Sequence, residues 1–515
     1  MDFASANPAL IPAQRVGALS GALTAAGYCA LAGFDVPAQR TLIMIIVVAV
    51  NLWRARRVRS LDTLLTALLL VLIFDPLAVT EVGFWLSFVA VLVLIYATGE
   101  IVAASGFWRQ CIYVHWAIAV GIAPLLAYFF ATIPLVGPPA NLFAVPWVSF
   151  VVVPLTLLGT FVQPWLPFLG YWFLRGALLA LELLWVPLQW LAQLPHATVA
   201  TPHPNVAALA CAAVGALVAL MPAGLPARTL ALVWFAPLFL CSPPRPQAGE
   251  FELTVLDVGQ GLSAVVLMRE HVLVFDTGPA FSERFDAGSA VVVPFLRHHG
   301  ITHVDALVVS HGDNDHIGGA ASLFKAMDVM RTLSSVPQKI QHGKVETCMQ
   351  GQQWTWDGVV FHMLGPASDA RLTGNDASCV LKVQNRSGER SVLLTGDIEA
   401  VGERSLLSSG AGLLSSTLVV APHHGSATSS TDAFVAATRP QLLAFAVGYK
   451  NRWRFPNPDV VNRWRSAGAQ QFRTDEDGAI SWNSEAGIQL QRFRRDHRHY
   501  WRAATQVQSE VGNQR

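Results

Sequence analysis

The sequence predicts a multi-domain protein in which an all-α, polytopic membrane domain precedes a soluble α/β domain. Long apolar runs without a single lysine occupy residues 16–241, whereas the remainder has the mixed polarity of a soluble domain. A second observation is the segment Ser310–Gly319, which places two histidines and two carboxylates in six residues after an apolar run. These residue types are common metal ligands. We therefore expect a membrane part followed by a metal-binding part.

The membrane domain is expected at residues 1–241, with about seven to nine helices, because roughly 20 apolar residues are needed to cross a membrane. The densest basic loop contains Arg54, Arg56, Arg57 and Arg59 and should be cytoplasmic. If all later apolar stretches cross, the soluble domain lies on the non-cytoplasmic side, with Arg40 as a misfit. If residues 166–194 lie in the interface instead, the side reverses.

The soluble domain is expected at residues 251–495, after a polar, proline-rich linker at 242–250. Its short apolar runs alternate with helical stretches, which predicts a sandwich of sheets covered by helices. Residues 496–515 should form a flexible basic tail. The net charge of +1 neither favours nor excludes nucleic acid. The six cysteines are scattered without a Cys-x-x-Cys pair, so we expect small buried apolar residues rather than a zinc ribbon or a disulfide framework.

The metal motif follows the short β-branched run at residues 304–309, so its ligands should lie in a loop at the carboxyl end of a buried strand. His311 and Asp313 are two residues apart and could hold one ion, while Asp315 and His316 turn towards a second. The alternative is a turn rich in Asp and Asn with incidental histidines.

Four further motifs each end an apolar run, and their order makes sense if they converge in space. They lie at residues 256–261, 275–278, 393–397 and 421–426. Asp397 could place one carboxylate oxygen on each of two ions about 3.5–4 Å apart, as two-metal hydrolysis requires. The pair His423 and His424 could then supply one ligand and one proton donor.

These motifs carry a resemblance. From residue 251 to about 492 the chain resembles the αββα metallo-β-lactamase fold, and across almost its full length it resembles the ComEC family of DNA-uptake proteins. The wider metallo-β-lactamase fold often has histidine where this chain has Asp313, and the aspartate adds to the resemblance to the DNA-uptake family. The segments that carry the resemblance are residues 36–40, 83–88, 256–261, 310–319, 394–397, 422–426 and 451–458.

The resemblance implies an inner-membrane channel that passes one DNA strand, with an attached nuclease that degrades the other strand by attack of metal-bound hydroxide. It implies two divalent metal ions, manganese or zinc, since the carboxylate-rich ligand set is harder than a histidine-rich one. His311 and Asp313 would bind one ion, with Asp397 bridging to the other. The second ion would be bound by Asp315, His316 and His424. His423 and Asp315 are the expected catalytic residues, with His423 facing the scissile phosphate.

The implied partners are DNA, membrane lipid, other competence-machinery proteins and a second copy of the chain. DNA would be a single strand in the channel and a duplex or non-transported strand at the nuclease. Cations interleave with aromatic residues in two segments, which suits backbone contact plus base stacking. The DNA-contact candidates are Lys450, Arg452, Trp453, Arg454, Arg463 and Arg465. The alternative is that Trp453 and Trp464 pack in the domain while the arginines are solvated.

Two departures from the family pattern lead to further expectations. Where the wider fold has another metal histidine, this chain has Asn375 and Asp376, so Asp376 or water could complete the first metal; Asp276 is another candidate site residue. The family normally carries earlier membrane helices and a small oligonucleotide-binding-type domain, so we expect a truncated product. Besides DNA uptake with a nuclease, the sequence leaves open a membrane-anchored esterase or phosphoesterase without transport, and an inactive fragment.

Overall fold

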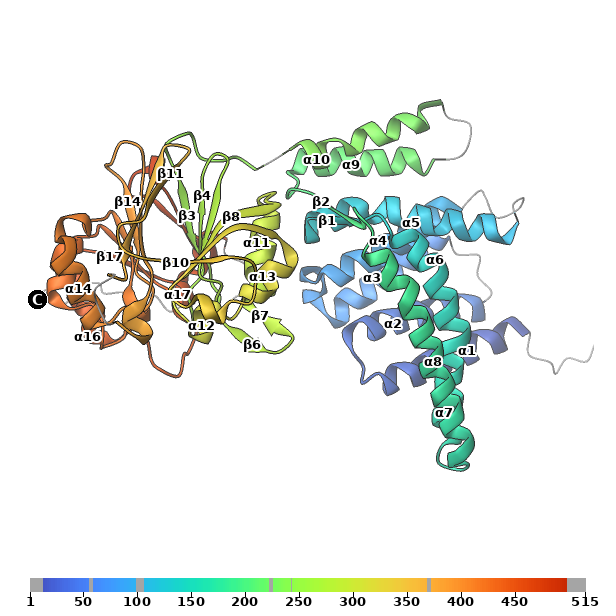
Figure 1. Ribbon diagram of the computed structural model, residues 1–515. Coiled ribbons are helices and arrows are strands. Elements are labelled where there is room, and N and C mark those ends of the chain that lie inside the picture. Colours follow the sequence, from blue (N-terminus) through green and yellow to red (C-terminus); the bar gives the residue numbers. More distant parts are fainter. Residues whose placement is uncertain are drawn as a thin grey trace, which may run out of the picture. The chain divides into compact units, whose positions relative to one another are not determined.

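The computed structural model describes residues 13–54, 59–98, 106–221, 226–241, 243–367 and 372–497. The chain divides into two compact units, Met1–Ser242 and Pro243–Arg515 (Figure 1). Arg56, Arg57 and residues 498–515, most of the expected basic tail, lie outside the described residues.

The first unit is helical, and four of its helical segments are long and apolar enough to cross a membrane. These are Val36–Trp53, Trp108–Phe130, Gly137–Val162 and Pro167–Ala192. Three shorter apolar helices are Ser60–Phe74, Val82–Ala97 and Val206–Ala219. The elements are α1 (Ala13–Leu31), α2 (Val36–Trp53), α3 (Ser60–Phe74), α4 (Val82–Thr98), α5 (Phe107–Phe130), α6 (Gly137–Trp147), α7 (Val153–Val162), α8 (Pro167–Ala192), α9 (Val206–Ala219) and α10 (Pro237–Leu240), with a two-stranded sheet of β1 (Thr132–Pro134) and β2 (Thr198–Ala200).

Arg40, the misfit in the predicted charge pattern, is buried in this helical unit. Its Nη2 atom lies 3.2 Å from Oε2 of Glu81, which stands just before α4. An arginine paired inside a helical unit does not act as a free loop charge, so it carries little weight in assigning a side of the membrane.

The second unit is built on two sheets that pack face to face. The first sheet contains, in spatial order, β10 (Val345–Thr347), β9 (Asp328–Ser334), β8 (His303–Val309), β5 (Val272–Phe275), β4 (Ala264–Leu267), β3 (Glu252–Val255), β18 (Ile480–Asn483) and β19 (Leu490–Arg492). The second contains β11 (Gln353–Trp356), β12 (Val359–Gly365), β13 (Val380–Gln384), β14 (Ser391–Leu394), β15 (Leu418–Val420), β16 (Leu442–Phe445) and β17 (Gln470–Arg473).

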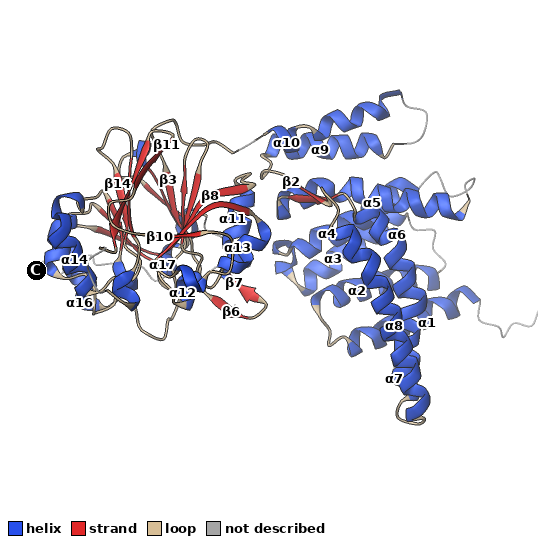
Figure 2. Cartoon of the chain, in the orientation of Figure 1, coloured by secondary structure: helices blue, strands red, loops and turns tan. Residues whose placement is uncertain are grey.

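Helices cover the outer face of each sheet, so the expected αββα sandwich is confirmed (Figure 2). Helices α11 (Val293–His298) and α13 (Ala320–Ala326) pack on the first sheet, and α14 (Ala400–Gly410), α15 (Asp432–Thr438) and α16 (Pro458–Ser466) pack on the second. Every residue of strand β4 is apolar because both faces of the strand are buried. Val266 faces the core between the sheets, whereas Val265 and Leu267 face the helices, because successive side chains alternate across a strand.

Parallel pairing brings the predicted motifs to one edge of each sheet. Strand β5 runs parallel to β8 in the first sheet, and β14 runs parallel to β15 in the second. The carboxyl ends of parallel neighbours lie at the same edge. Asp276 follows β5, the Ser310–Gly319 segment follows β8, Asp397 follows β14 and His423 follows β15.

A disulfide joins Cys348 and Cys379, which corrects the expectation that the cysteines are simply small buried apolar residues. Their Cα atoms are 5.9 Å apart although 31 positions separate them in sequence. Cys348 directly follows β10 of the first sheet, and Cys379 directly precedes β13 of the second sheet. The bridge therefore links segments of the two sheets, a meeting that the spacing of cysteines along the chain does not reveal.

Candidate metal centre

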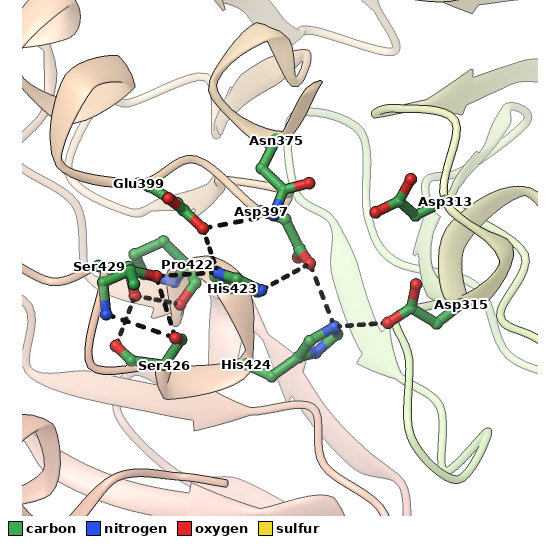
Figure 3. Close-up of polar contacts among 12 residues, drawn as sticks. Asp313, Asp315, Asn375, Asp397, Glu399, Pro422, His423, His424, Ser426 and Ser429 are labelled. Atoms are coloured by element: carbon green, nitrogen blue, oxygen red, sulfur yellow. Dashed lines mark hydrogen bonds and ion pairs between the residues drawn. The ribbon is translucent and has the colours of Figure 1, made fainter. Parts of the chain in front are cut away.

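Four potential ligands converge between the carboxyl edges of the two sheets. One donor atom from each of Asp315, His316, Asp397 and His424 lies within 4.8 Å of the others. Asp315 and His316 belong to the short helix α12 (Asn314–Ile317), which follows β8. The imidazole Nε2 of His316 is 3.1 Å from Asp397 Oδ1. The Nε2 of His424 is 3.4 Å from Asp397 Oδ2 and 3.3 Å from Asp315 Oδ2 (Figure 3).

Hydrogen bonds on the far side of each ring aim these imidazoles at the centre. Asp276, buried and with φ of 57°, accepts from the His316 Nδ1 at 2.7 Å, and also from the amide and hydroxyl of Ser310 at 2.6 Å each. The carbonyl of Ala446 accepts from His424 Nδ1 at 2.7 Å. Because carboxylates and carbonyls only accept, each Nδ1 carries a proton, and Nε2 is the nitrogen that faces the centre and would bind a metal once its own proton is lost. Asp276 therefore orients a ligand, and both of its oxygens are already engaged.

His311 and Asp313 lie beside this group as a second pair. The Nε2 of His311 is 3.7 Å from Asp313 Oδ2, and the rings of His311 and His316 have centroids 4.2 Å apart. His311 is buried, whereas the Asp313 side chain is 63% exposed. Figure 3 shows the Asp313 carboxylate on the same side of the site as Asp315.

Nε2 of His311 is buried without a hydrogen-bond partner among the described residues, and the buried Oδ1 of Asp397 has only the His316 Nε2 nearby, at 3.1 Å. A buried polar atom without a partner costs free energy. Asp397 belongs to the donor cluster, and the His311 ring packs beside that of His316. Nitrogen and oxygen donors of this kind suit a divalent cation. The residues present therefore fit a bound metal.

The charge balance of the centre also favours a cation. Burial alone would raise the pKa of Asp397, but the imidazoles of His316 and His424 lower it well below the usual range. Burial alone would lower the pKa of His316 and of His424, but the Asp397 carboxylate raises both. Burial would likewise raise the pKa of Asp315, and the hydrogen bond from His424 lowers it. The carboxylates thus remain ionised and require positive charge nearby, from protons or from a metal.

His423 faces the centre from a different position. Its side chain is 20% exposed, and its Nε2 lies 3.9 Å from Asp397 Oδ2. Its Nδ1 lies 3.1 Å from Oε1 of Glu399 and 3.2 Å from the Thr428 hydroxyl. Glu399 is a site residue that the sequence reasoning missed. Its position two residues after Asp397 was the available signal.

Asn375 and Asp376 lie in a short 3₁₀ turn (Gly374–Ala377) beside Asp397. Oδ1 of Asp376 accepts from the amides of Glu399 at 2.9 Å and Gly402 at 2.7 Å, so this carboxylate caps the start of α14. The side chain of Asn375 lies next to Asp397 in Figure 3, with its Nδ2 3.5 Å from Glu399 Oε1. Asp376 therefore caps a helix and is not one of the four clustered ligand residues.

Comparison with known proteins identifies the family. The model of the competence protein family matches residues 6–226, and that of the metallo-β-lactamase superfamily matches residues 256–446. Competence protein ComA of Neisseria gonorrhoeae is 37% identical over 486 residues, covering 94% of this chain and 67% of the relative. The chain belongs to this competence-protein family. It is a membrane protein whose second unit has the metallo-β-lactamase fold.

Other relatives match with lower identity. The uncharacterized protein YcaI of Escherichia coli K12 is 30% identical, covering 91% of this chain and 62% of the relative. Across four such relatives the chain spans 58–67% of the relative's length. The solved structure of CmlA, a diiron β-hydroxylase from Streptomyces venezuelae, matches at 14% identity and a TM-score of 0.32, covering 47% of this chain and 55% of that one, a similarity too low to support an inference.

Two segments of this competence-family chain interleave cations with aromatic residues, one around Trp464 and one around Trp453. Their surroundings differ. Trp464 is fully buried against the second sheet, and Arg463 pairs with Asp432 at 2.8 Å. Arg465 is exposed and bonds to Asn462 of its own helix. The other segment, residues 449–455, leaves Lys450, Arg452, Trp453 and Arg454 exposed. Only this second segment borders the centre, through a contact between Phe455 and His423.

Proposed function

We propose that this competence-family protein takes up DNA through its membrane unit and hydrolyses phosphodiester bonds at the metal centre, degrading the strand that is not transported. The observation that carries the proposal is the convergence of Asp315, His316, Asp397 and His424 with a separately oriented acid–base residue, His423, at its border. The competence naming of the gonococcal relative supports DNA uptake as the setting.

The centre is proposed to hold two divalent ions. Asp315, His316 and His424 would hold one ion, and His311 and Asp313 would hold the other, with Asp397 shared between them. When bound, such ions supply the Lewis acidity and the activated water that phosphodiester hydrolysis needs. The three carboxylates make manganese a strong competitor of zinc.

The protein's own acid–base group is His423. Its Nδ1 lies 3.1 Å from Oε1 of Glu399, and its Nε2 is directed at the Asp397 side of the centre. An imidazolium held there can donate its Nε2 proton to the leaving oxygen of a phosphodiester. Its partial exposure keeps it within reach of a substrate that arrives from solvent.

The hydrolase unit is proposed to lie on the non-cytoplasmic side of the inner membrane. The Cys348–Cys379 disulfide supports this side, because disulfides persist in oxidising compartments and are rare in the cytosol. A phosphatase reporter that is active only outside the cytoplasm, fused to the carboxyl terminus, should be active. An inactive reporter, with an active cytoplasmic reporter at the same position, would reverse the assignment.

The test of hydrolysis uses the full chain purified in detergent, with labelled DNA and added Mn²⁺ or Zn²⁺. Cleavage is expected with one of these ions and not with a chelator, and Asp315→Ala should abolish it. Glu389→Ala, which alters an exposed carboxylate between β13 and β14, is the matched control and should cleave normally. DNA that stays intact with every divalent metal would contradict the nuclease proposal. Turnover of a phosphocholine or thioester substrate in that case would favour the esterase alternative.

A further inference from the structure

A loop with its own internal hydrogen bonds borders the metal centre. Residues 449–455, here called the aromatic loop, lie between β16 and α16. Asn451 fixes the loop: its Nδ2 donates to the carbonyls of Gly448 at 3.1 Å and Phe455 at 2.8 Å, and its Oδ1 accepts from the Phe455 amide at 2.8 Å. Lys450 and Arg454 take left-handed φ values of 52° and 58°. This internal network holds the backbone of the loop in a defined conformation.

The loop is also attached to the turn that carries the site histidines. The Asn457 amide, two residues beyond the loop, donates to the Gly425 carbonyl at 2.8 Å. On the other side, the Gly448 amide donates to Oε1 of Gln260 at 3.1 Å. Gly425 directly follows His423 and His424. The position of the aromatic loop is therefore tied to the position of these two imidazoles.

Within the aromatic loop a row of rings leads from solvent to His423. The Arg452 guanidinium lies 4.2 Å from the centroid of the Trp453 ring. The rings of Trp453 and Phe455 are stacked, with centroids 6.4 Å apart and planes within 14°. The Phe455 ring meets the His423 ring edge to face at 5.8 Å. Only the Phe455 ring therefore lies between Trp453, where a ligand could stack, and His423, the proposed acid–base residue.

The surface of this loop is apolar and positively charged at once. Trp453 is 49% exposed, and Tyr449, beneath the Lys450 ammonium at 5.2 Å, is 73% exposed. The loop contains Lys450, Arg452 and Arg454 and no acidic residue. In the described part of the chain, none of these three cations forms an ion pair with a carboxylate. Exposed aromatic rings whose neighbouring cations have no carboxylate partner match a ligand with flat apolar rings and negative charges, and such a ligand would displace the Arg452 guanidinium from the Trp453 face.

Nucleic acid has these properties, but only an unpaired strand offers its base faces. In a duplex the bases stack on one another, and a protein surface reaches mainly phosphates and groove edges. We propose that the aromatic loop stacks an unpaired base near the scissile phosphate and so selects single-stranded DNA over duplex DNA as the substrate of the metal centre. This inference rests on the proposed nuclease function.

The test compares three DNA substrates with the full chain in detergent and Mn²⁺: a single-stranded oligonucleotide, the same strand carrying abasic residues, and its duplex. Wild type should cleave the single strand fastest. Base–aromatic stacking is typically strong enough that Trp453→Ala should lower kcat/KM on the single strand about tenfold, and Trp453→Phe about twofold. On the abasic strand the loss from Trp453→Ala should shrink to about twofold, because the stacking partner is gone.

Phe493→Ala is the matched control, since Phe493 is a similarly exposed aromatic, at 52%, outside the aromatic loop. It should match wild type on all three substrates. If Trp453→Ala behaves like Phe493→Ala, or loses as much on the abasic strand as on the intact strand, or if duplex is cleaved fastest, the stacking inference is overturned while the nuclease stands. If wild type cleaves no DNA with any divalent metal, the proposed function fails first.

Binding provides a second measurement that does not depend on hydrolysis. Anisotropy of a labelled single strand in the presence of chelator should show a Kd about fivefold higher for Trp453→Ala than for Phe493→Ala. Equal Kd values for the two variants would overturn the inference.

Discussion

His423 and His424 are consecutive and share a left-handed backbone, with φ values of 47° and 55°, yet their surroundings differ. The His424 side chain is 3% exposed and its Nε2 lies between Asp315 and Asp397. The His423 side chain is more open, and its Nδ1 meets Glu399. The acceptor at Nδ1 and the depth of burial, rather than residue type, separate a proposed ligand from a proposed acid.

The largest effect is expected from the buried member of the pair. His424→Ala removes a proposed ligand, so DNA cleavage by the full chain should fall by about 10³-fold. Metal content after desalting, measured by elemental analysis, should fall as well. A variant that keeps its full metal content would remove His424 from the ligand set.

His423→Ala should lower kcat by about 10²-fold, the usual scale for loss of a general acid. Its metal content should match wild type, because His423 is not among the four clustered ligand residues. The ratio of the metal contents of the two variants therefore tests the comparison directly. Equal metal loss in both variants would show that the two histidines share one role.

A smaller effect is expected from Glu399→Gln, which keeps the shape of the side chain but weakens its hold on His423. Loss of a carboxylate behind an imidazole typically costs about tenfold. The reduction should appear in kcat, and metal content should stay at the wild-type level. Glu389→Gln is the control, and an unchanged kcat in Glu399→Gln would show that Glu399 does not act through His423.

The smallest expected effect is the pH dependence of metal binding. Asp397 raises the pKa of His316 and of His424, so the metal-free centre retains protons that a metal must displace. Metal affinity should therefore rise as pH increases through these pKa values. In the metal-free protein the same shifts stabilise the fold at low pH, and this contribution is lost as pH rises through the folded-state pKa.

Calorimetry in two buffers of different ionisation enthalpy would count the protons released on metal binding. His424→Ala should release about one proton fewer than wild type, whereas His423→Ala should release the same number. A reduced count in His423→Ala would place that residue among the ligands.

Sequence patterns alone were enough to predict the membrane region, the sandwich and the segments that meet at the metal centre. These features follow from local patterns: apolar length, strand periodicity, and ligand-type residues at strand ends. The cluster of Asp315, His316, Asp397 and His424 is such a case, because parallel strands bring their carboxyl ends to one edge.

The contacts of each polar side chain became known only from the three-dimensional fold. In the fold, Asp276 accepts from His316, and Asp376 caps the start of α14. Glu399 lies beside His423, and a disulfide joins Cys348 to Cys379. The fold also buries Trp464 while leaving Trp453 exposed at the metal centre's border. These outcomes depend on distances between segments far apart in the chain and on burial, and a local sequence pattern contains neither.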